Sequence, residues 1–173
     1  MKDIILIATI KDWNINNFYE FKKKFEDKYN LYLITNKDDL IYQNVKDLNP
    51  KYIFFPHWSW LIPNEIYKNY ECILFHMTDL PYGRGGSPLQ NLITNKIYNT
   101  KISAIKVTKE LDEGDIYLKE NFDISKGSAR EIYENASNLI FSELIPKIIE
   151  NNLIPTKQEG DIVLFKRRTP EQS

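Results

Sequence analysis

Apolar runs and amphipathic segments alternate along the first half of the chain. The apolar runs are nearly continuous, as is typical of strands buried on both faces of a sheet. They occupy residues 3–9, 31–34, 52–55 and 71–75. Helical spacing of apolar side chains separates them, at residues 12–28, at residues 38–48 and after Pro63. Strands that alternate with helices in this way predict parallel strand pairs.

The second half predicts an antiparallel pair of strands. We expect strands over residues 101–107 and 116–122, a last short strand over 161–165, and a short helix over 89–95 that Pro88 opens. The predicted fold is therefore an α/β, Rossmann-like open twisted sheet, mostly parallel with an antiparallel part, with helices on both faces. No repeat or linker interrupts the pattern, and we expect one domain over residues 1–173.

The longest helical pattern runs from residue 128 to residue 151. Ser128 and Glu131 stand three positions apart at its start, which is the sequence signature of a capping box. Pro146 lies inside the pattern, and a proline there cannot donate the helical hydrogen bond. The sequence therefore predicts one long helix that is kinked or split at Pro146.

Composition narrows the class of protein. With 42% hydrophobic and 27% charged residues, the chain of 173 residues is globular rather than disordered or fibrous. A net charge of −1 argues against binding to nucleic acid by charge alone. Cys72 is the single cysteine, and no Cys/His cluster has the spacing of a zinc site. The apolar runs are too short to span a membrane, so we expect a cytoplasmic protein without a bound metal.

Chemically unusual segments follow the third and fourth apolar runs, where the ligand crevice of an open α/β sheet is expected. The first is segment 57–63, in which Trp58 and Trp60 stand on either side of Ser59. These tryptophans would either plug the sheet edge or form a wall for a flat ligand whose ring edge bonds the backbone. Composition alone favours the plug.

The second unusual segment begins with His76, directly after an apolar run, and continues into a glycine-rich stretch around Arg84. The glycines permit a close approach of the backbone to a ligand, and an imidazole can serve in either protonation state. The third segment, 110–115, is acidic and lies between the two later strands. It is either an ordinary acidic turn or the source of a carboxylate for the histidine.

The order and spacing of these motifs resemble the folate-dependent formyltransferase family. Residues 76–90 match a histidine followed by Leu-Pro and then by Arg-Gly-x-x-Pro-x-Gln. Asp112 matches the family aspartate in its Leu-Asp-x-Gly context, 36 positions after His76. Segment 60–63 resembles the loop that cradles the pterin ring. Residues 76–91 are most similar to the small enzymes that modify nucleotide-linked amino sugars for bacterial surface glycans.

The resemblance implies transfer of a formyl group from 10-formyltetrahydrofolate to the amine of a nucleotide-linked amino sugar. His76 would donate a hydrogen bond to the developing oxyanion, and Asp112 would relay the proton of the amine. The residues expected to hold the folate are Trp60, Leu61, Ile62, Val107 and Leu111, and those expected to hold the acceptor are Arg84, Thr78 and Asn91. The expected partners are thus small molecules, not a membrane or a nucleic acid, and a homodimer is one expected assembly.

Two departures from the family pattern accompany the resemblance. Leu74 stands where the family has an asparagine whose amide helps to hold the oxyanion, and Thr78 and Asn91 are the nearest replacement donors in the sequence. The relatives also continue past the Arg-Arg-x-Pro-Glu segment that residues 167–171 match, so a longer C-terminal segment is expected to be missing.

Other functions stay open at this level. The same histidine and aspartate would serve a methionyl-tRNA formyltransferase, although the near-neutral charge argues against a grip on RNA. They would also serve a formyl-folate hydrolase. A module that binds folate or a sugar nucleotide without catalysis is favoured only by Leu74 and the short C-terminus.

Overall fold

The computed structural model describes residues 1–169, so Pro170 and Glu171 of the expected C-terminal motif lie outside the described residues. The helices are α1 (Asp12–Phe25), α2 (Tyr42–Leu48), α3 (Asn64–Asn69), α4 (Pro88–Thr94), α5 (Ala129–Leu139) and α6 (Ile145–Asn151). The strands are β1 (Asp3–Thr9), β2 (Tyr29–Ile34), β3 (Tyr52–His57), β4 (Cys72–His76), β5 (Tyr82–Gly85), β6 (Asn99–Lys106), β7 (Ile116–Asp123) and β8 (Val163–Phe165).

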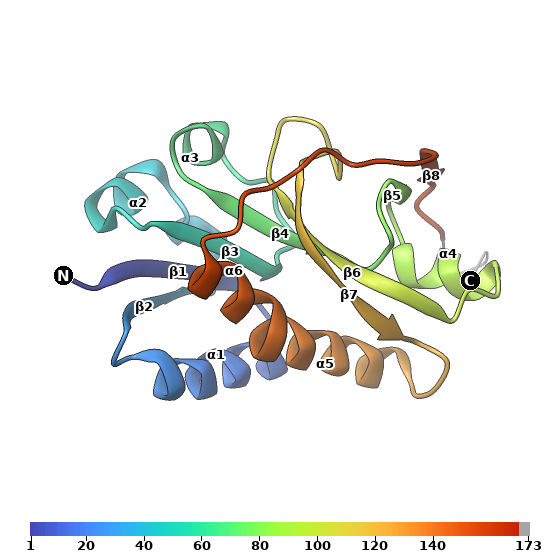
Figure 1. The fold of residues 1–173 in the computed structure, drawn as a ribbon, viewed down its shortest axis with the longest axis horizontal. Helices are drawn as coiled ribbons and strands as arrows, with labels where there is room; N and C mark the ends of the chain where they lie inside the picture. The colour runs from blue at the N-terminus through green and yellow to red at the C-terminus, as the bar shows by residue number, and fades with distance from the viewer. Residues whose placement is uncertain (170–173) are drawn as a thin grey trace.

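Six of the strands form one mixed sheet in the order β2-β1-β3-β4-β6-β7. The first four run parallel, and β6 and β7 add an antiparallel pair to the edge next to β4. Helices cover both faces, with α1 and α5 on one side and α2 and α3 on the other (Figure 1). The predicted fold class is therefore confirmed.

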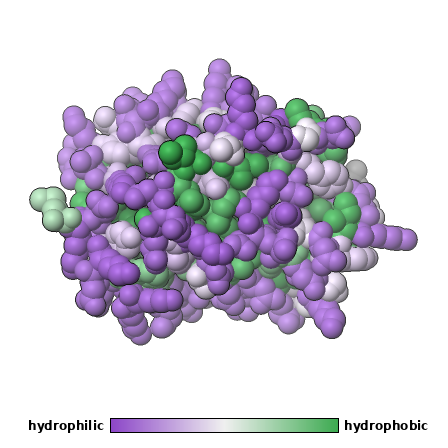
Figure 2. All heavy atoms as spheres, in the orientation of Figure 1, coloured by the Kyte–Doolittle hydropathy of each residue, from purple (hydrophilic) through white to green (hydrophobic). Residues whose placement is uncertain are grey.

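Each face of the sheet carries its own apolar core, because consecutive side chains of a strand point to opposite faces. Ile5, Ile7 and Phe54 pack on the side of α1, α5 and α6. Leu6, Ile53 and Phe55 pack on the side of α2 and α3. Figure 2 shows polar side chains over most of one face of the molecule, with apolar ones gathered near its centre. No helix within residues 1–169 is long and apolar enough to cross a membrane.

The long C-terminal helical pattern is split, as Pro146 predicted. The capping box of Ser128 and Glu131 opens α5, and a π-helical segment, Ile140–Leu144, joins α5 to α6. Pro146 then lies in the first turn of α6, directly after the π-helical segment.

The glycine-rich stretch differs from the expected loop. Tyr82–Gly85 forms the strand β5, which pairs in parallel with β8 to make a second, two-stranded sheet. A strand that contains two glycines at positive φ has no alternation of apolar side chains, so the sequence pattern did not reveal it. This pairing brings the C-terminal segment beside the loop that follows His76 (Figure 1).

Candidate active site

His76 and Asp112 meet in space, although they come from different elements. His76 ends β4, and Asp112 lies in the turn between β6 and β7, where it holds a positive φ of 59°. The imidazole Nδ1 lies 3.6 Å from the carboxylate Oδ1. Both residues are buried, with 8% and 6% of their surface exposed. The expected meeting of this histidine with a carboxylate from the acidic turn is confirmed.

The neighbours of His76 fix the orientation of its ring. Nε2 lies 2.7 Å from the carbonyl oxygen of Gly83, and because a carbonyl oxygen only accepts, Nε2 carries the hydrogen. The hydroxyl of Thr78 donates to the same carbonyl at 3.3 Å. Nδ1 is therefore the nitrogen that faces Asp112 and is left for a substrate. Its distance from the carboxylate is longer than a hydrogen bond, so the carboxylate does not block it.

Asp112 is held by β5 and by Gln158, a residue that the sequence analysis did not single out. The backbone N–H of Gly85 donates to Oδ2 of Asp112 at 2.9 Å. The side-chain amide of Gln158 donates to the carbonyl oxygens of Asp112 and Gly114, at 2.8 and 2.9 Å. No spacing rule connects Gln158 with the acidic turn, so only the fold reveals this contact.

The three residues expected to bind the acceptor are engaged within the protein. Arg84 donates to the side-chain oxygen of Gln158 at 3.1 and 2.8 Å, and it pairs with Glu113 at 3.4 Å. The Thr78 hydroxyl bonds Gly83, and the Asn91 amide donates to the carbonyl oxygens of Gly86, Ser87 and Lys166. All three side chains are therefore bonded within the protein in this structure, and their roles in binding stay predictions.

A cavity of about 380 Å³ lies beside His76, between the ends of β3 and β4 and the helices α1 and α5. Arg84, Thr78 and Asn91 do not line it. Its polar side chains are Asn14, His57, His76, Tyr133, Ser137 and Arg167, and its lining holds no Asp or Glu. Burial, with a smaller contribution from Lys11, lowers the pKa of His57. At neutral pH the uncharged form of that imidazole is therefore favoured.

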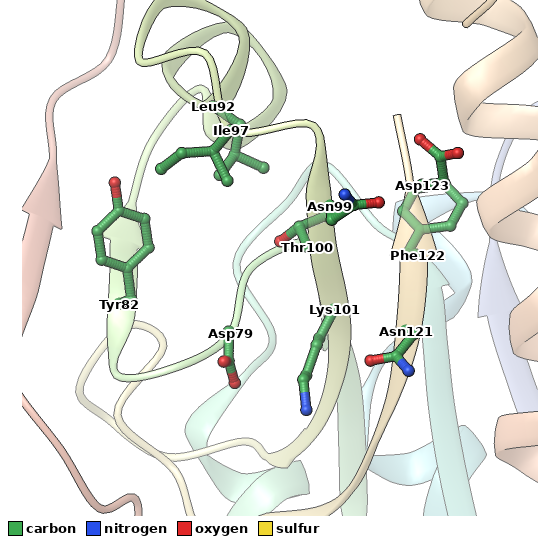
Figure 3. Close-up of a pocket in the computed structure, with 10 residues that line it drawn as sticks. All are labelled: Asp79, Tyr82, Leu92, Ile97, Asn99, Thr100, Lys101, Asn121, Phe122 and Asp123. Atoms are coloured by element: carbon green, nitrogen blue, oxygen red, sulfur yellow. The ribbon is translucent and has the colours of Figure 1, made fainter. Parts of the chain in front are cut away.

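A second and larger cavity, of about 690 Å³, lies on the other side of the loop that follows β4. Figure 3 shows Tyr82, Leu92 and Ile97 facing the β6–β7 pair across it. Neither His76 nor Asp112 lines this cavity. The smaller cavity is thus the one that contains the imidazole with a carboxylate partner.

The expected folate segment has the features of a binding wall for a flat ring. Trp60 is 39% exposed and Leu61 is 96% exposed. No hydrogen bond within residues 1–169 engages their backbone groups. The indole N–H of Trp58 is buried and has no partner among the described residues, which leaves it for a ligand. Ile62 and Trp58 also pack against the core that faces α2 and α3, so the segment is both plug and wall.

The second half of the expected folate site lies beside this wall. Val107 belongs to the same apolar cluster as Trp58 and Ile62, and it is buried. Leu111 is 69% exposed at the tip of the turn that delivers Asp112. The residues present thus fit a flat, partly apolar group between the two segments. The structure does not test their roles in binding, which stay predictions.

Leu74 lies two residues before His76 on β4, on the same side of the strand. Its side chain packs toward Trp58, Ile62 and Val107 in the apolar cluster. A leucine has no donor, and neither Thr78 nor Asn91 lines the cavity to replace the missing amide.

Known proteins place this geometry in context. No family model matches the chain. Methionyl-tRNA formyltransferase of Rickettsia massiliae is 28% identical over 152 residues, which are 86% of this chain and 50% of that protein. The chain thus spans about half the length of the curated relatives it matches.

Solved structures give a closer likeness. The formyltransferase PseJ from Anoxybacillus kamchatkensis, in complex with UDP-4,6-dideoxy-4-formamido-L-AltNAc and tetrahydrofolate, shares the fold at a TM-score of 0.71 and 18% identity, over 94% of this chain and 85% of its own. Methionyl-tRNA formyltransferase from Clostridium thermocellum superposes with a TM-score of 0.95 at 55% identity, over 98% of this chain and 74% of its own. With identity this high over most of both chains, this chain belongs to the folate-dependent formyltransferase family.

Proposed function

We propose that this protein transfers a formyl group from 10-formyltetrahydrofolate to a primary amine. The observation that carries the proposal is the buried pair of His76 and Asp112, of which His76 lines the cavity. Family membership supports it, and so do the free backbone groups of the Trp58–Ile62 wall. Within this proposal the wall holds the folate and the cavity holds the acceptor.

His76 acts on the oxygen of the formyl group. When the amine attacks the formyl carbon, negative charge develops on that oxygen, and Nδ1–H of the imidazolium donates to it. Nε2 remains on the carbonyl of Gly83, which keeps the ring from turning away. Removing one such donor typically costs about 10²–10³ in rate. With Leu74 in place of an amide donor, the dependence on His76 is at the upper end of that range.

Asp112 acts on the protons of the reaction. Its carboxylate takes the proton that the attacking nitrogen must lose. When the carbon–nitrogen bond to the folate breaks, that proton passes to the folate nitrogen as it leaves. The reaction then releases the formamide and tetrahydrofolate without a net change in protons from a neutral amine.

We further propose that the acceptor is a nucleotide-linked amino sugar. A cavity of about 380 Å³ accommodates a sugar ring with its amine, and the overall charge near −1 offers little general attraction to RNA. The amino-acid sequence of residues 76–91 also resembles that branch of the family. The second candidate acceptor is methionyl-tRNA, which the printed names of the relatives from Rickettsia and Clostridium favour.

A mass-shift assay tests both levels of the proposal. The protein is incubated with 10-formyltetrahydrofolate and either a panel of nucleotide-linked amino sugars or methionyl-tRNA, and each acceptor is examined for a gain of one formyl group. We expect transfer to an amino sugar, and none by the His76→Asn and Asp112→Asn variants. Glu113→Gln, which removes a charge next to Asp112 outside the pair, serves as the control and should stay active.

The outcomes separate the alternatives. Formylation of methionyl-tRNA alone would support the enzyme and reject the sugar. Release of formate without an acceptor would identify a hydrolase. Folate binding without transfer to any amine would identify a binding module. Near-normal transfer by His76→Asn would overturn the proposed mechanism.

A further inference from the structure

The C-terminal strap, Lys166–Arg168, lies against the loop between β5 and α4. Asn91 donates to the carbonyl oxygen of Lys166 at 2.9 Å, and the backbone N–H of Arg168 donates to the Ser87 hydroxyl at 3.0 Å. A Cβ added at Gly86 would come within 3.1 Å of the Cβ of Arg167, so the two backbones are in close contact. The strap is therefore held at both ends and along its middle.

Arg167 is the residue that this strap delivers to the cavity beside His76. It lines the cavity together with His57 and His76, and it is exposed. No hydrogen bond or ion pair joins its guanidinium to any residue within 1–169. The lining holds no carboxylate, so the positive charge of Arg167 has no compensating charge in the cavity.

Arg84 differs from Arg167 in each of these respects. Its side chain is only 12% exposed, is bonded twice to Gln158, and is paired with Glu113. Binding an anion at Arg84 would require those bonds to break, whereas Arg167 has none to lose. The guanidinium available to a ligand at this site is therefore the one on the strap.

We propose that Arg167 binds a phosphate group of the acceptor and so places the acceptor amine beside His76. The inference rests on the proposed function and adds to it the residue that recognises the phosphate of the acceptor. A guanidinium forms paired hydrogen bonds with phosphate oxygens, and these bonds strengthen where no other charge competes. A diphosphate that links a sugar to a nucleoside is such a group, and it lies a short distance from the amine of the sugar.

The first test measures binding, so it does not depend on transfer. Uridine diphosphate, uridine monophosphate and pyrophosphate are titrated into the protein by calorimetry. The variants are Arg167→Met and, as matched control, Lys166→Met, which removes the same charge from the neighbouring exposed residue of the strap. We expect Arg167→Met to weaken binding of the diphosphates about tenfold or more, Arg167→Lys to weaken it less, and Lys166→Met to leave it unchanged.

The second test uses the kinetics of transfer. Arg167→Met should raise the KM of the acceptor about tenfold with kcat changed much less, because the bond to the phosphate is the same in the ground state and the transition state. Equal binding of the probes by wild type and Arg167→Met would overturn the proposal, as would wild type that binds none of them. Methionyl-tRNA is titrated in the same way. If Arg167→Met binds this tRNA more weakly than wild type but binds the small probes equally well, the proposal is also overturned, in favour of a macromolecular acceptor. If wild type transfers no formyl group but Arg167→Met still binds the diphosphates more weakly than wild type, only the proposed function is rejected.

Discussion

At the scale of single residues, the positions of His76 and Asp112 depend on neighbours that have no proposed role in the reaction itself. The carbonyl of Gly83 selects the protonated nitrogen of His76, and Thr78 steadies that carbonyl. Gln158 holds the backbone of the Asp112 turn at two oxygens and also accepts from Arg84. The amide of Gln158 thus links the turn that carries Asp112 to β5.

Replacing Gln158 tests this link. In Gln158→Ala, two carbonyl oxygens of the turn lose their donor, so Asp112 should move relative to His76. We expect kcat to fall by roughly tenfold to a hundredfold, because small displacements of a catalytic group are costly. The KM of the acceptor should change much less, because Gln158 does not line the cavity. Steady-state kinetics measure both values.

The exposed neighbour Lys157 provides the control for Gln158, and Lys157→Ala should match wild type in kcat and KM. A rise in the KM of Gln158→Ala with an unchanged kcat would show that the residue serves binding instead of the position of Asp112.

The family resemblance predicted that His76 and Asp112 meet, but the sequence did not reveal all the residues that hold them. His76 and Asp112 belong to motifs with a fixed order in the family. His76 directly follows a predicted apolar strand, and Asp112 lies in the predicted turn between two later strands. Arg84 was expected to meet the acceptor because a free arginine in a glycine-rich loop suggests a ligand. Its partner Gln158 lies 74 residues further along the chain, and no local pattern announces a contact at that separation.

At the scale of elements, the small sheet of β5 and β8 connects Asp112 with the C-terminal segment. Gly85 pairs with Phe165 in this sheet while its N–H bonds Asp112. It holds a φ of 107°, and a Cβ there would lie closer to the carbonyl oxygen of Phe165 than any real contact allows. Only glycine can serve this position, because both the backbone angle and the space exclude a side chain.

Gly85→Ala should therefore harm both stability and catalysis. The positive φ alone costs about 1–2 kcal/mol, and the clash with β8 adds to it. We expect a lower melting temperature together with a loss of kcat, since the bond from residue 85 to Asp112 would shift. Circular dichroism and steady-state kinetics measure the two effects.

Gly160→Ala is the matched control for Gly85→Ala. Gly160 has a φ of 122°, but its added Cβ would meet only ordinary contacts at 3.8 and 3.9 Å. It should lose stability from the backbone angle and keep its kcat. Equal loss of kcat in both variants would mean that strain alone, not the contact with Asp112, explains the result.

The parallel strands and helices were predictable where apolar residues repeat, and β5 was not. β1 and β3 are long apolar runs whose burial on both faces leaves a clear mark in the sequence. β5 consists of Tyr-Gly-Arg-Gly, and its strand geometry is imposed by pairing with β8 far along the chain. Tertiary pairing determines such a strand, so it is invisible to a pattern read over neighbouring residues.

At the scale of the whole molecule, the two faces of the sheet serve the two proposed substrates. The apolar cluster of α2 and α3 supports the folate wall through Trp58, Ile62 and Val107. The acceptor cavity opens on the face of α1 and α5, where it is lined by Asn14, Tyr133 and Ser137. His76 ends β4 and lines the cavity, and Trp58 belongs both to the cavity lining and to the apolar cluster on the other face, so the two proposed substrate regions meet beside His76.

The same layered core makes the stability of the protein sensitive to alkaline pH. Cys72 begins β4 and is 1% exposed. Burial, and next the charge of Glu71, raises the pKa of its thiol from 9.0 to about 12. Below pH 9 the thiol is neutral in both the folded and the unfolded chain, so its ionisation does not change the free energy of unfolding. Above pH 9 the unfolded chain ionises first, so stability falls as the pH rises toward 12, by up to about 1.4 kcal/mol per pH unit for one group.

Cys72→Ala should remove this part of the pH dependence. Denaturant unfolding between pH 8 and pH 10 measures it, and the free energy of unfolding should decline less steeply in the variant than in wild type. The variant is expected to be less stable at pH 8, because it loses a buried sulfur, and the gap should narrow as the pH rises. Burial also raises the pKa values of the tyrosines Tyr52 and Tyr117. The charge of Cys72 is the last of the causes that raise the pKa of Tyr117, so the variant also lacks that contribution. Parallel curves for the two proteins would show that the thiol ionises in the folded state as readily as in water.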